Sequence, residues 1–189
     1  MEKLKVRITG ESPLLMHSIA SQNVANQTAK VFKALSKKRN KTDSDLLELR
    51  RMEWAMGLYT KKGKIIIFGE VIEATMKEAG KKFKLGKEVS KAIRCVDDPE
   101  LDYPDKKLPL SELYEKDGYA FSVSVRVDKS RVNRTRPRFD DWSIATEIVY
   151  DESRLDKSQV VDILNEAGTY IGFCDWRPRF GRFKVEVIK

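Results

Sequence analysis

The sequence is poor in the residues that usually build metal and redox sites, since it has one histidine, His17, and two cysteines, Cys95 and Cys174. The cysteines lack metal-site spacing, so we expect reduced structural thiols, with neither a metal nor another cofactor. No apolar run approaches the roughly 18 residues of a membrane span. The opening residues MEKLKVRITG lack the apolar core of a signal peptide. These absences predict a cytoplasmic protein with no membrane partner, and the lack of a phosphate-loop motif gives no indication of a nucleotide-dependent enzyme.

Positive charge, by contrast, is abundant. The chain has 37 Lys and Arg against 29 Asp and Glu, a formal net charge of +8 and an isoelectric point of about 9.4. An excess of this size favours a polyanionic partner, either nucleic acid or an anionic membrane surface. Hydrophobic residues make up 41% of the 189 residues, which is enough to build the core of one large domain.

Hydrophobic periodicity predicts an α+β fold. Strands are expected at residues 3–10, 119–127, 142–150 and 181–189, and helices at 69–83 and 156–168. Residues 11–67 are interpreted as an insertion after the first strand, with helices at 24–35 and 45–59 and a hairpin that turns at Gly63. The remaining order, β-α-β-β-α-β, is that of a ferredoxin-like, RRM-type domain. We therefore predict that residues 1–189 form a single RRM-like domain with this helical and hairpin insertion.

The tetrapeptide RPRF occurs twice, at 136–139 and 177–180. In the predicted topology the strand order is 4-1-3-2, and each copy leads into a strand that flanks the first strand. Because neighbouring strands lie about 4.8 Å apart, the beginnings of these two strands should be on the order of 10 Å from each other. The topology therefore predicts that two loops, 129–138 and 176–182, lie at one end of the sheet.

Both predicted loops combine basic residues with aromatic ones. Arginine binds phosphate bidentately and stacks on bases, and free bases stack on aromatic rings. This pattern predicts a site for single-stranded nucleic acid, although the aromatic residues could instead be buried as strand anchors. The candidate contact residues in the loops are Lys129, Arg131, Arg134, Arg136, Arg138, Trp142, Trp176, Arg177, Arg179 and Arg182.

Acidic residues are interpreted as structural. Asp43 and Asp45 lie at the start of the second inserted helix, where helix caps are expected. Asp140, Asp141 and Asp175 flank the RPRF copies and are expected to orient the neighbouring arginines. No acidic cluster has the spacing of a metal site.

His17 lies just after the first predicted strand, at the same end of the sheet as the two loops. A histidine beside a phosphate can act as general acid or base in metal-independent RNA cleavage. It can equally contact the ligand, or pack, without a chemical role. We include His17 among the nucleic-acid-binding residues and assign no catalytic residue, so binding is favoured over catalysis.

Three segments share a pattern with a known family. They are KVRITGESPLLMHS, LYTKKGKIIIFGEVIEATMKEAG and AGTYIGFCDWRPRFGRFKV, in this order along the chain. Together they resemble the RAMP superfamily of CRISPR-associated proteins, in its backbone-subunit branch. The resemblance implies an RRM-like core that binds single-stranded RNA, a hairpin that acts as a thumb, and subunits that stack into a filament or ring, alone or with other effector subunits. Because the chain is short for such a subunit, a compact relative from a phage or another mobile element fits as well as a subunit of an antiviral effector complex.

Three functional hypotheses follow from these patterns. The leading one is a protein that binds single-stranded nucleic acid, RNA rather than DNA, and that associates with itself. The second is a metal-independent endoribonuclease of the CRISPR RNA-processing type that uses His17. The third is a phage protein-interaction module that binds an acidic host protein or mimics an effector subunit.

Overall fold

The computed structural model describes residues 1–22, 25–127 and 130–188. Over these residues the chain is a mixed α/β protein with antiparallel strand pairs, in agreement with the predicted α+β class. It divides into two compact units, each built from segments that are distant in sequence. The first unit holds Met1–Leu14, Thr60–Pro104 and Asp140–Lys189, and the second holds Leu15–Tyr59 and Asp105–Phe139. The second unit thus joins most of the predicted insertion to residues 105–139, which were expected to belong to the RRM-like domain.

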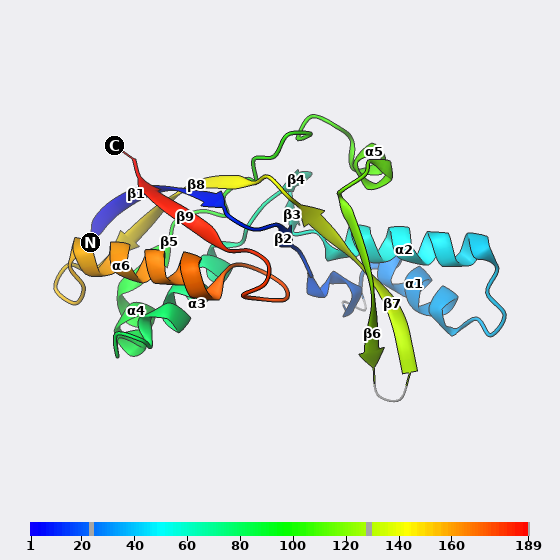
Figure 1. Cartoon of the computed structure of the whole chain (residues 1–189), viewed down its shortest axis with the longest axis horizontal. Helices are drawn as coiled ribbons and strands as arrows, with labels where there is room; N and C mark the ends of the chain where they lie inside the picture. The colour runs from blue at the N-terminus through cyan, green and yellow to red at the C-terminus, as the bar shows by residue number, and fades with distance from the viewer. Residues whose placement is uncertain (23–24, 128–129, 189) are drawn as a thin grey trace. The chain divides into compact units, whose positions relative to one another are not determined.

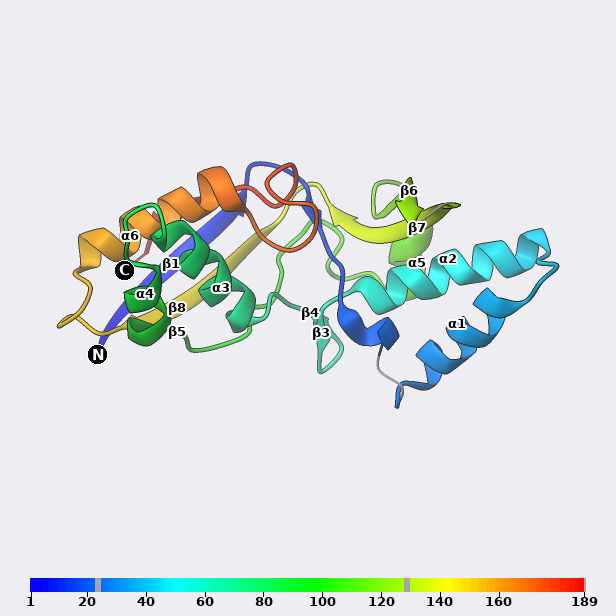
Figure 2. The same ribbon diagram turned by 90° about the horizontal axis from the view of Figure 1, so that it is seen from below.

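A four-stranded antiparallel sheet with strand order β5-β8-β1-β9 forms the centre of the first unit. Helices lie on one face of this sheet, as Figures 1 and 2 show together. The strands are β1 (Glu2–Gly10), β5 (Ile93–Cys95), β8 (Ser143–Tyr150) and β9 (Phe183–Val187). The helices are α3 (Gly69–Gly80), α4 (Gly86–Ala92) and α6 (Lys157–Glu166), and a π-helical turn η2 (Ala167–Ile171) continues α6.

The alternation of β1 explains which face the helices cover. Leu4, Val6 and Ile8 are buried, whereas the residues between them are exposed. Successive side chains of a strand point to opposite faces, so burying these three against the helices leaves the charged residues of β1 on the other face. The predicted hairpin beside this core is also confirmed, because β3 (Thr60–Lys61) pairs with β4 (Lys64–Ile65). It turns through Gly63, whose φ of 77° suits glycine.

One predicted strand of this sheet is wrong. Residues 119–127 were expected to form its second strand, but that place is taken by β5, which has only three residues. The residues expected in the sheet form β6 (Ala120–Val127) of a different, three-stranded sheet with order β2-β7-β6. A strand as short as β5 shows no period-two pattern, and the clear alternation of β6 does not encode which sheet it joins.

The expected basic loop at 129–138 is also mostly a strand, β7 (Ser130–Phe139). Thr135, Pro137 and Phe139 alternate on its buried side. The Thr135 amide points away from β6, since it donates to Glu53. Backbone nitrogens two residues apart in a strand point to the same side, so the Pro137 nitrogen also points away from β6. The missing N–H of the proline therefore removes no bond to β6, which is why the strand tolerates it. Lys129 lies outside the described residues.

The second unit packs this hairpin against helices. A short strand, β2 (Leu14–Leu15), completes its sheet. The buried indole of Trp54 donates a hydrogen bond of 2.7 Å to the Tyr119 carbonyl and meets the Tyr114 ring edge-on, so it joins a helix to the residue before β6. The helical elements are η1 (Ile19–Gln22), α1 (Gln27–Lys37), α2 (Asp43–Gly57) and α5 (Leu110–Glu115).

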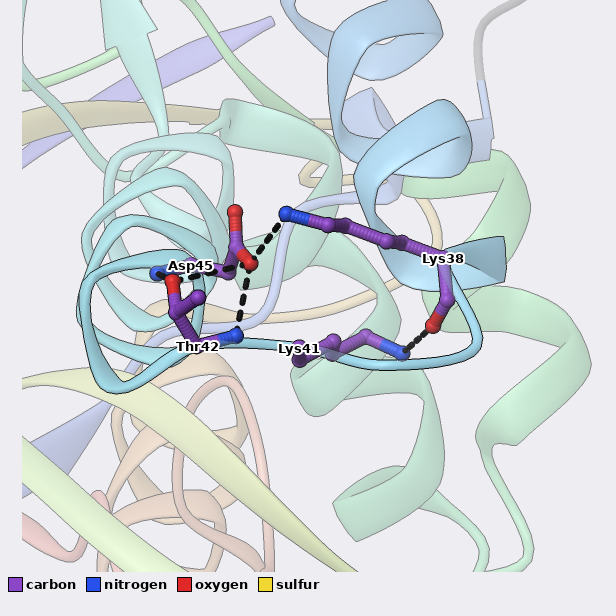
Figure 3. Close-up of polar contacts among 4 residues, drawn as sticks. All are labelled: Lys38, Lys41, Thr42 and Asp45. Carbon is purple, nitrogen blue, oxygen red and sulfur yellow. Dashed lines mark hydrogen bonds and ion pairs between the residues drawn. The ribbon is translucent and has the colours of Figure 1, made fainter.

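The predicted capping role is confirmed for Asp45. Figure 3 shows its carboxylate accepting a hydrogen bond of 2.7 Å from the Thr42 amide and one of 2.6 Å from Lys38 Nζ. The Thr42 hydroxyl accepts the Asp45 amide in return at 3.2 Å, which completes a capping box at the start of α2. Lys41 Nζ also donates to the Lys38 carbonyl, so the connection between α1 and α2 is held by local contacts.

Across the described part of the chain, no helix combines the length and the apolar character needed to cross a lipid bilayer.

Candidate nucleic-acid interface

A basic pocket of about 290 Å³ lies within the second unit. Three of its lining residues, His17, Arg134 and Arg136, were predicted to bind nucleic acid, and the structure brings them together although they come from opposite ends of the unit's sequence. The other lining residues are Ser18, Phe32, Lys33, Glu53, Met56 and Gly57. The pocket therefore gathers three cationic side chains, a histidine and a hydroxyl around one carboxylate.

Glu53 on α2 organises the two arginines. Arg134 and Arg136 are two positions apart on β7, so both side chains lie on the same face of the strand. Glu53 Oε1 accepts from Arg134 Nη1 at 3.2 Å and from Arg136 Nη1 at 3.3 Å. Its other oxygen accepts the Thr135 amide at 2.9 Å. One carboxylate thus accepts a β7 amide that does not bond to β6, and it fixes two guanidinium groups side by side.

The electrostatic balance of this pocket favours an anion. Glu53 offsets one of the two guanidinium charges, and Lys33 adds another positive charge at the rim. The Arg134 side chain is 37% exposed, against 13% for Arg136, so Arg134 presents the more accessible guanidinium. A guanidinium carries five N–H donors in a planar fork that matches phosphate oxygens. The arrangement can therefore hold a phosphate group next to His17.

The second RPRF copy forms an exposed loop in the first unit. Trp176 is 46% exposed, and the Arg179 guanidinium lies 5.6 Å from the centre of its ring. The Phe180 ring packs against the same indole, with 5.5 Å between the ring centres. Phe180 is itself buried, so it attaches the loop to the core of the unit. Arg177 and the exposed Tyr170 line the adjoining pocket of about 520 Å³. This loop has the arginine and aromatic combination that the sequence predicted, with an indole that is partly exposed to solvent.

Two glycines make the loop possible. The Phe173 amide donates to the Gly181 carbonyl at 2.8 Å, which brings the two ends of the loop together. A Cβ at Gly181 would lie 2.1 Å from the Phe173 carbonyl oxygen, and one at Gly172 would lie 2.9 Å from the Phe180 carbonyl oxygen. Both glycines also have positive φ. A side chain at either position would prevent this closure.

Trp142 is a core residue rather than a contact residue, contrary to the prediction. It is 4% exposed, and its indole nitrogen donates to the Ser12 carbonyl at 2.9 Å. Its ring packs on Phe173 and Phe183, and a Cβ on Gly10 would come within 2.3 Å of the indole. The alternative reading, an aromatic strand anchor, is the correct one here, because nothing in the sequence separates a buried indole from an exposed one beside arginines.

The remaining predicted residues lie on the same two segments. Arg131 is exposed on β7, opposite Arg126 of β6. Arg138 lies partly buried, with its guanidinium 5.8 Å from the centre of the Phe121 ring. Arg182 is exposed at the end of the second loop, and its backbone is fixed by Ser12 Oγ, which accepts the Arg182 amide at 2.9 Å.

The relation between the two RPRF copies was predicted in part. The strands that follow them, β8 and β9, do flank β1 at one end, where Ser143 pairs with Thr9 and Phe183 pairs with Gly10. The first copy, however, is not a loop of that sheet. It ends β7, and it belongs to the second unit.

Several residues of the pocket were not predicted from the sequence to belong to a binding site. Lys33 lies on α1 with Lys30 and Lys37, a helical spacing that could have suggested a basic face. Glu53 is one acid among many on α2, and no pattern distinguishes it. Its role depends on a contact with β7, more than 80 residues away along the chain.

Cys95 and Cys174 are both free thiols in the structure. Burial raises the pKa of both thiols above the ordinary value, although the Thr146 hydroxyl, 3.1 Å from Cys95 Sγ, opposes the shift there. Among the residues with a described position, no group of three or more His, Cys, Asp or Glu side chains could hold a metal ion.

No protein-family model and no curated protein matches the sequence. The resemblance to the RAMP superfamily therefore stays a prediction.

Proposed function

We propose that this protein binds single-stranded nucleic acid through the basic pocket of the second unit and the Trp176 loop of the first. The observation that carries the proposal is the pocket in which Glu53 holds Arg134 and Arg136 together beside His17. Prearranged guanidinium groups cost little entropy to order when a phosphate binds, and they recognise it bidentately. The preference for RNA over DNA rests on the family resemblance.

The Trp176 loop favours single strands over duplexes. An indole that is 46% exposed and bordered by Arg177 and Arg179 offers a platform for an unpaired base. Stacking of one base on such a ring is worth about 1–3 kcal/mol and is tolerant of sequence. Bases inside a duplex are already stacked and cannot reach it.

The element order of the first unit supports a ferredoxin-like core. Without the small hairpin and α4, the order is β1-α3-β5-β8-α6-β9, and the sheet order β5-β8-β1-β9 is the one that such a core requires. A core of this kind is what the RAMP resemblance implies, together with self-association into a filament or ring. The second unit, with its β6-β7 hairpin, would then act as the thumb.

The test is binding of a fluorescein-labelled oligouridylate by two double variants. Arg134→Ala with Arg136→Ala removes the pocket cations, and Arg177→Ala with Arg179→Ala removes those of the loop. Each pair should weaken binding roughly tenfold or more, since each removes two charge-assisted contacts. All four changes together should abolish binding while circular dichroism shows an intact fold.

The matched control is Arg39→Ala with Arg94→Ala, one exposed arginine from each unit outside both sites. It removes the same charge and should change affinity by no more than about twofold.

If about five phosphates are neutralised, log affinity should fall against log salt with a slope of roughly −3 to −4. Salt-insensitive binding would overturn the proposal, and so would a variant with all four substitutions that binds like the wild type. A saturable protein partner with no oligonucleotide binding would instead support the protein-interaction hypothesis.

A second candidate function is favoured by the position of His17. It lines the same pocket as two guanidinium groups and Lys33, and the Tyr59 hydroxyl donates to its carbonyl at 3.3 Å. A histidine so placed could take the proton of a ribose 2′-hydroxyl as its oxygen attacks phosphorus, and return a proton to the 5′-oxygen as the P–O5′ bond breaks. The cations would stabilise the negative charge on the phosphate oxygens. The expected products are a 2′,3′-cyclic phosphate and a 5′-hydroxyl, formed in EDTA from RNA but not from DNA. Loss of cleavage in His17→Ala would establish this activity, whereas intact RNA after long incubation with the wild type would exclude it.

A further inference from the structure

A lysine-rich groove lies between α3 and α4 of the first unit, and its lining includes none of the residues assigned above. Its volume is about 770 Å³. It is lined by Lys77, Lys81, Lys84, Gly86, Lys87, Glu88, Ser90 and Lys91. Five ammonium groups thus face one carboxylate, and the apolar part of the lining comes from lysine stems rather than from aromatic rings.

The turn between the helices brings these lysines together. Lys84 has a φ of 61°, and the next amide, of Leu85, donates back to the Gly80 carbonyl at 2.8 Å, which ends α3 sharply. A Cβ on Gly86 would lie 3.2 Å from the Lys77 carbonyl oxygen, so the start of α4 lies directly against α3. Lysines from the last turn of α3, from the turn and from α4 therefore line one groove.

The charge of this groove is only partly offset. Lys81 is paired with Glu78, and Lys91 lies 3.5 Å from Glu88. Glu88 is shared, because Arg154 also donates to it at 2.8 Å. Within the described part of the chain, no carboxylate lies within ion-pair distance of Lys77, Lys84 or Lys87 in the structure, and these three groups supply the excess charge. Stabilisation of the α3 dipole accounts for lysines in its last turn but not for those of α4.

Glu78 connects the groove with the Trp176 loop. It pairs with Lys81 of the groove, and it also lines the pocket formed by Trp176 and Arg177. A longer strand with one base stacked on Trp176 could therefore continue, beyond the nucleotides next to that base, along the edge of the groove.

We propose that this groove binds the phosphate backbone of the same single strand whose base stacks on Trp176, as a sequence-independent extension of that site. Lysine is a point charge without a planar fork, and the groove has no aromatic lining, so it suits phosphates rather than bases. The inference rests on the proposed function, because it takes the same ligand.

The experiment compares two charge reversals. Lys77→Glu with Lys87→Glu changes one unpaired lysine of each helix, and Lys62→Glu with Lys107→Glu makes the same change at two exposed positions outside the groove. With a long oligouridylate at low salt, the groove variant should bind roughly tenfold more weakly than the control. Its salt slope should be shallower by about 1.4, the loss of two phosphate contacts to a single strand. A trinucleotide, which reaches only Trp176, should bind both variants equally.

The outcomes separate the two proposals. If the wild type binds no oligouridylate, the proposed function itself fails. If the wild type binds and the groove variant matches the control in affinity and slope, the groove inference alone is overturned. Binding of polyglutamate, lost in the groove variant while oligouridylate binding persists, would also overturn it in favour of an acidic protein ligand. Circular dichroism of both variants shows whether the helices remain folded.

Discussion

The Arg136 guanidinium lies 3.3 Å from the Glu53 carboxylate, and both side chains are only 13% exposed. This pair holds a cation at the pocket while partly neutralising it. We predict that Glu53→Gln raises the affinity for oligouridylate roughly threefold to tenfold at low salt, because one opposing charge is lost at close range. The same change should lower the free energy of unfolding by about 1–2 kcal/mol, since charge-assisted hydrogen bonds become neutral ones.

Glu48→Gln is the control for this prediction, because it removes the same charge from an exposed position of α2. Fluorescence anisotropy and urea unfolding measure the two effects. Weaker binding by Glu53→Gln than by Glu48→Gln would show that the carboxylate positions the arginines more than it competes with the ligand.

Trp176 should report ligand binding by fluorescence. Trp54 and Trp142 are 1% and 4% exposed, so only Trp176 offers an indole face to a base. We expect oligouridylate to quench the intrinsic emission, and Trp176→Phe to remove the quenching. Trp142→Phe should retain it. Quenching that survives in Trp176→Phe would place the stacked base elsewhere.

Trp142 should matter for stability rather than for contact with the ligand. Trp142→Ala empties a buried site beside Phe173 and Phe183 and should cost about 3–5 kcal/mol in urea unfolding. The same substitution at exposed Trp176 should cost less than about 1 kcal/mol. Equal costs at the two positions would contradict the burial that separates them.

Asp45 should make stability depend on pH in the acid range. The hydrogen bond from Lys38, with that from the Thr42 amide, lowers the pKa of Asp45 to about 2. A folded pKa below the ordinary value of about 3.9 stabilises the fold above that pH, and the contribution is lost as pH falls through about 2. Asp45→Asn should therefore lower the melting temperature at neutral pH, and the difference from the wild type should vanish near pH 2.

Asp43→Asn serves as the comparison for Asp45, since Asp43 begins α2 but makes none of the capping-box contacts. Its melting temperature should stay closer to that of the wild type at neutral pH. A constant difference between Asp45→Asn and the wild type from pH 7 to pH 2 would show that the ion pair contributes nothing.

Local elements were predictable because their signals are local. The alternation of Leu4, Val6 and Ile8 locates β1, and Asp43 and Asp45 mark the start of α2. The β3-β4 hairpin follows from its turn at Gly63. Each of these patterns lies within a few consecutive residues, so it can be recognised from the sequence alone.

The assignment of strands to sheets was not predictable in the same way. β5 has three residues and no visible period, yet it takes the place in the four-stranded sheet that the strongly patterned β6 was expected to fill. Burial on one face produces the same alternation in either sheet, and the choice depends on partners far along the chain.

The sequence by itself determined the α+β composition, the positive charge, the capped helices and the arginine-rich segments around Trp176 and Arg134. Only the tertiary structure decided that Trp142 is buried while Trp176 is exposed, and that Glu53 joins Arg134 and Arg136 beside His17. The physical reason is that residue type and spacing fix what a side chain can do and which way it points along its own element. Whether it meets solvent or a partner depends on elements that fold against it from distant parts of the chain.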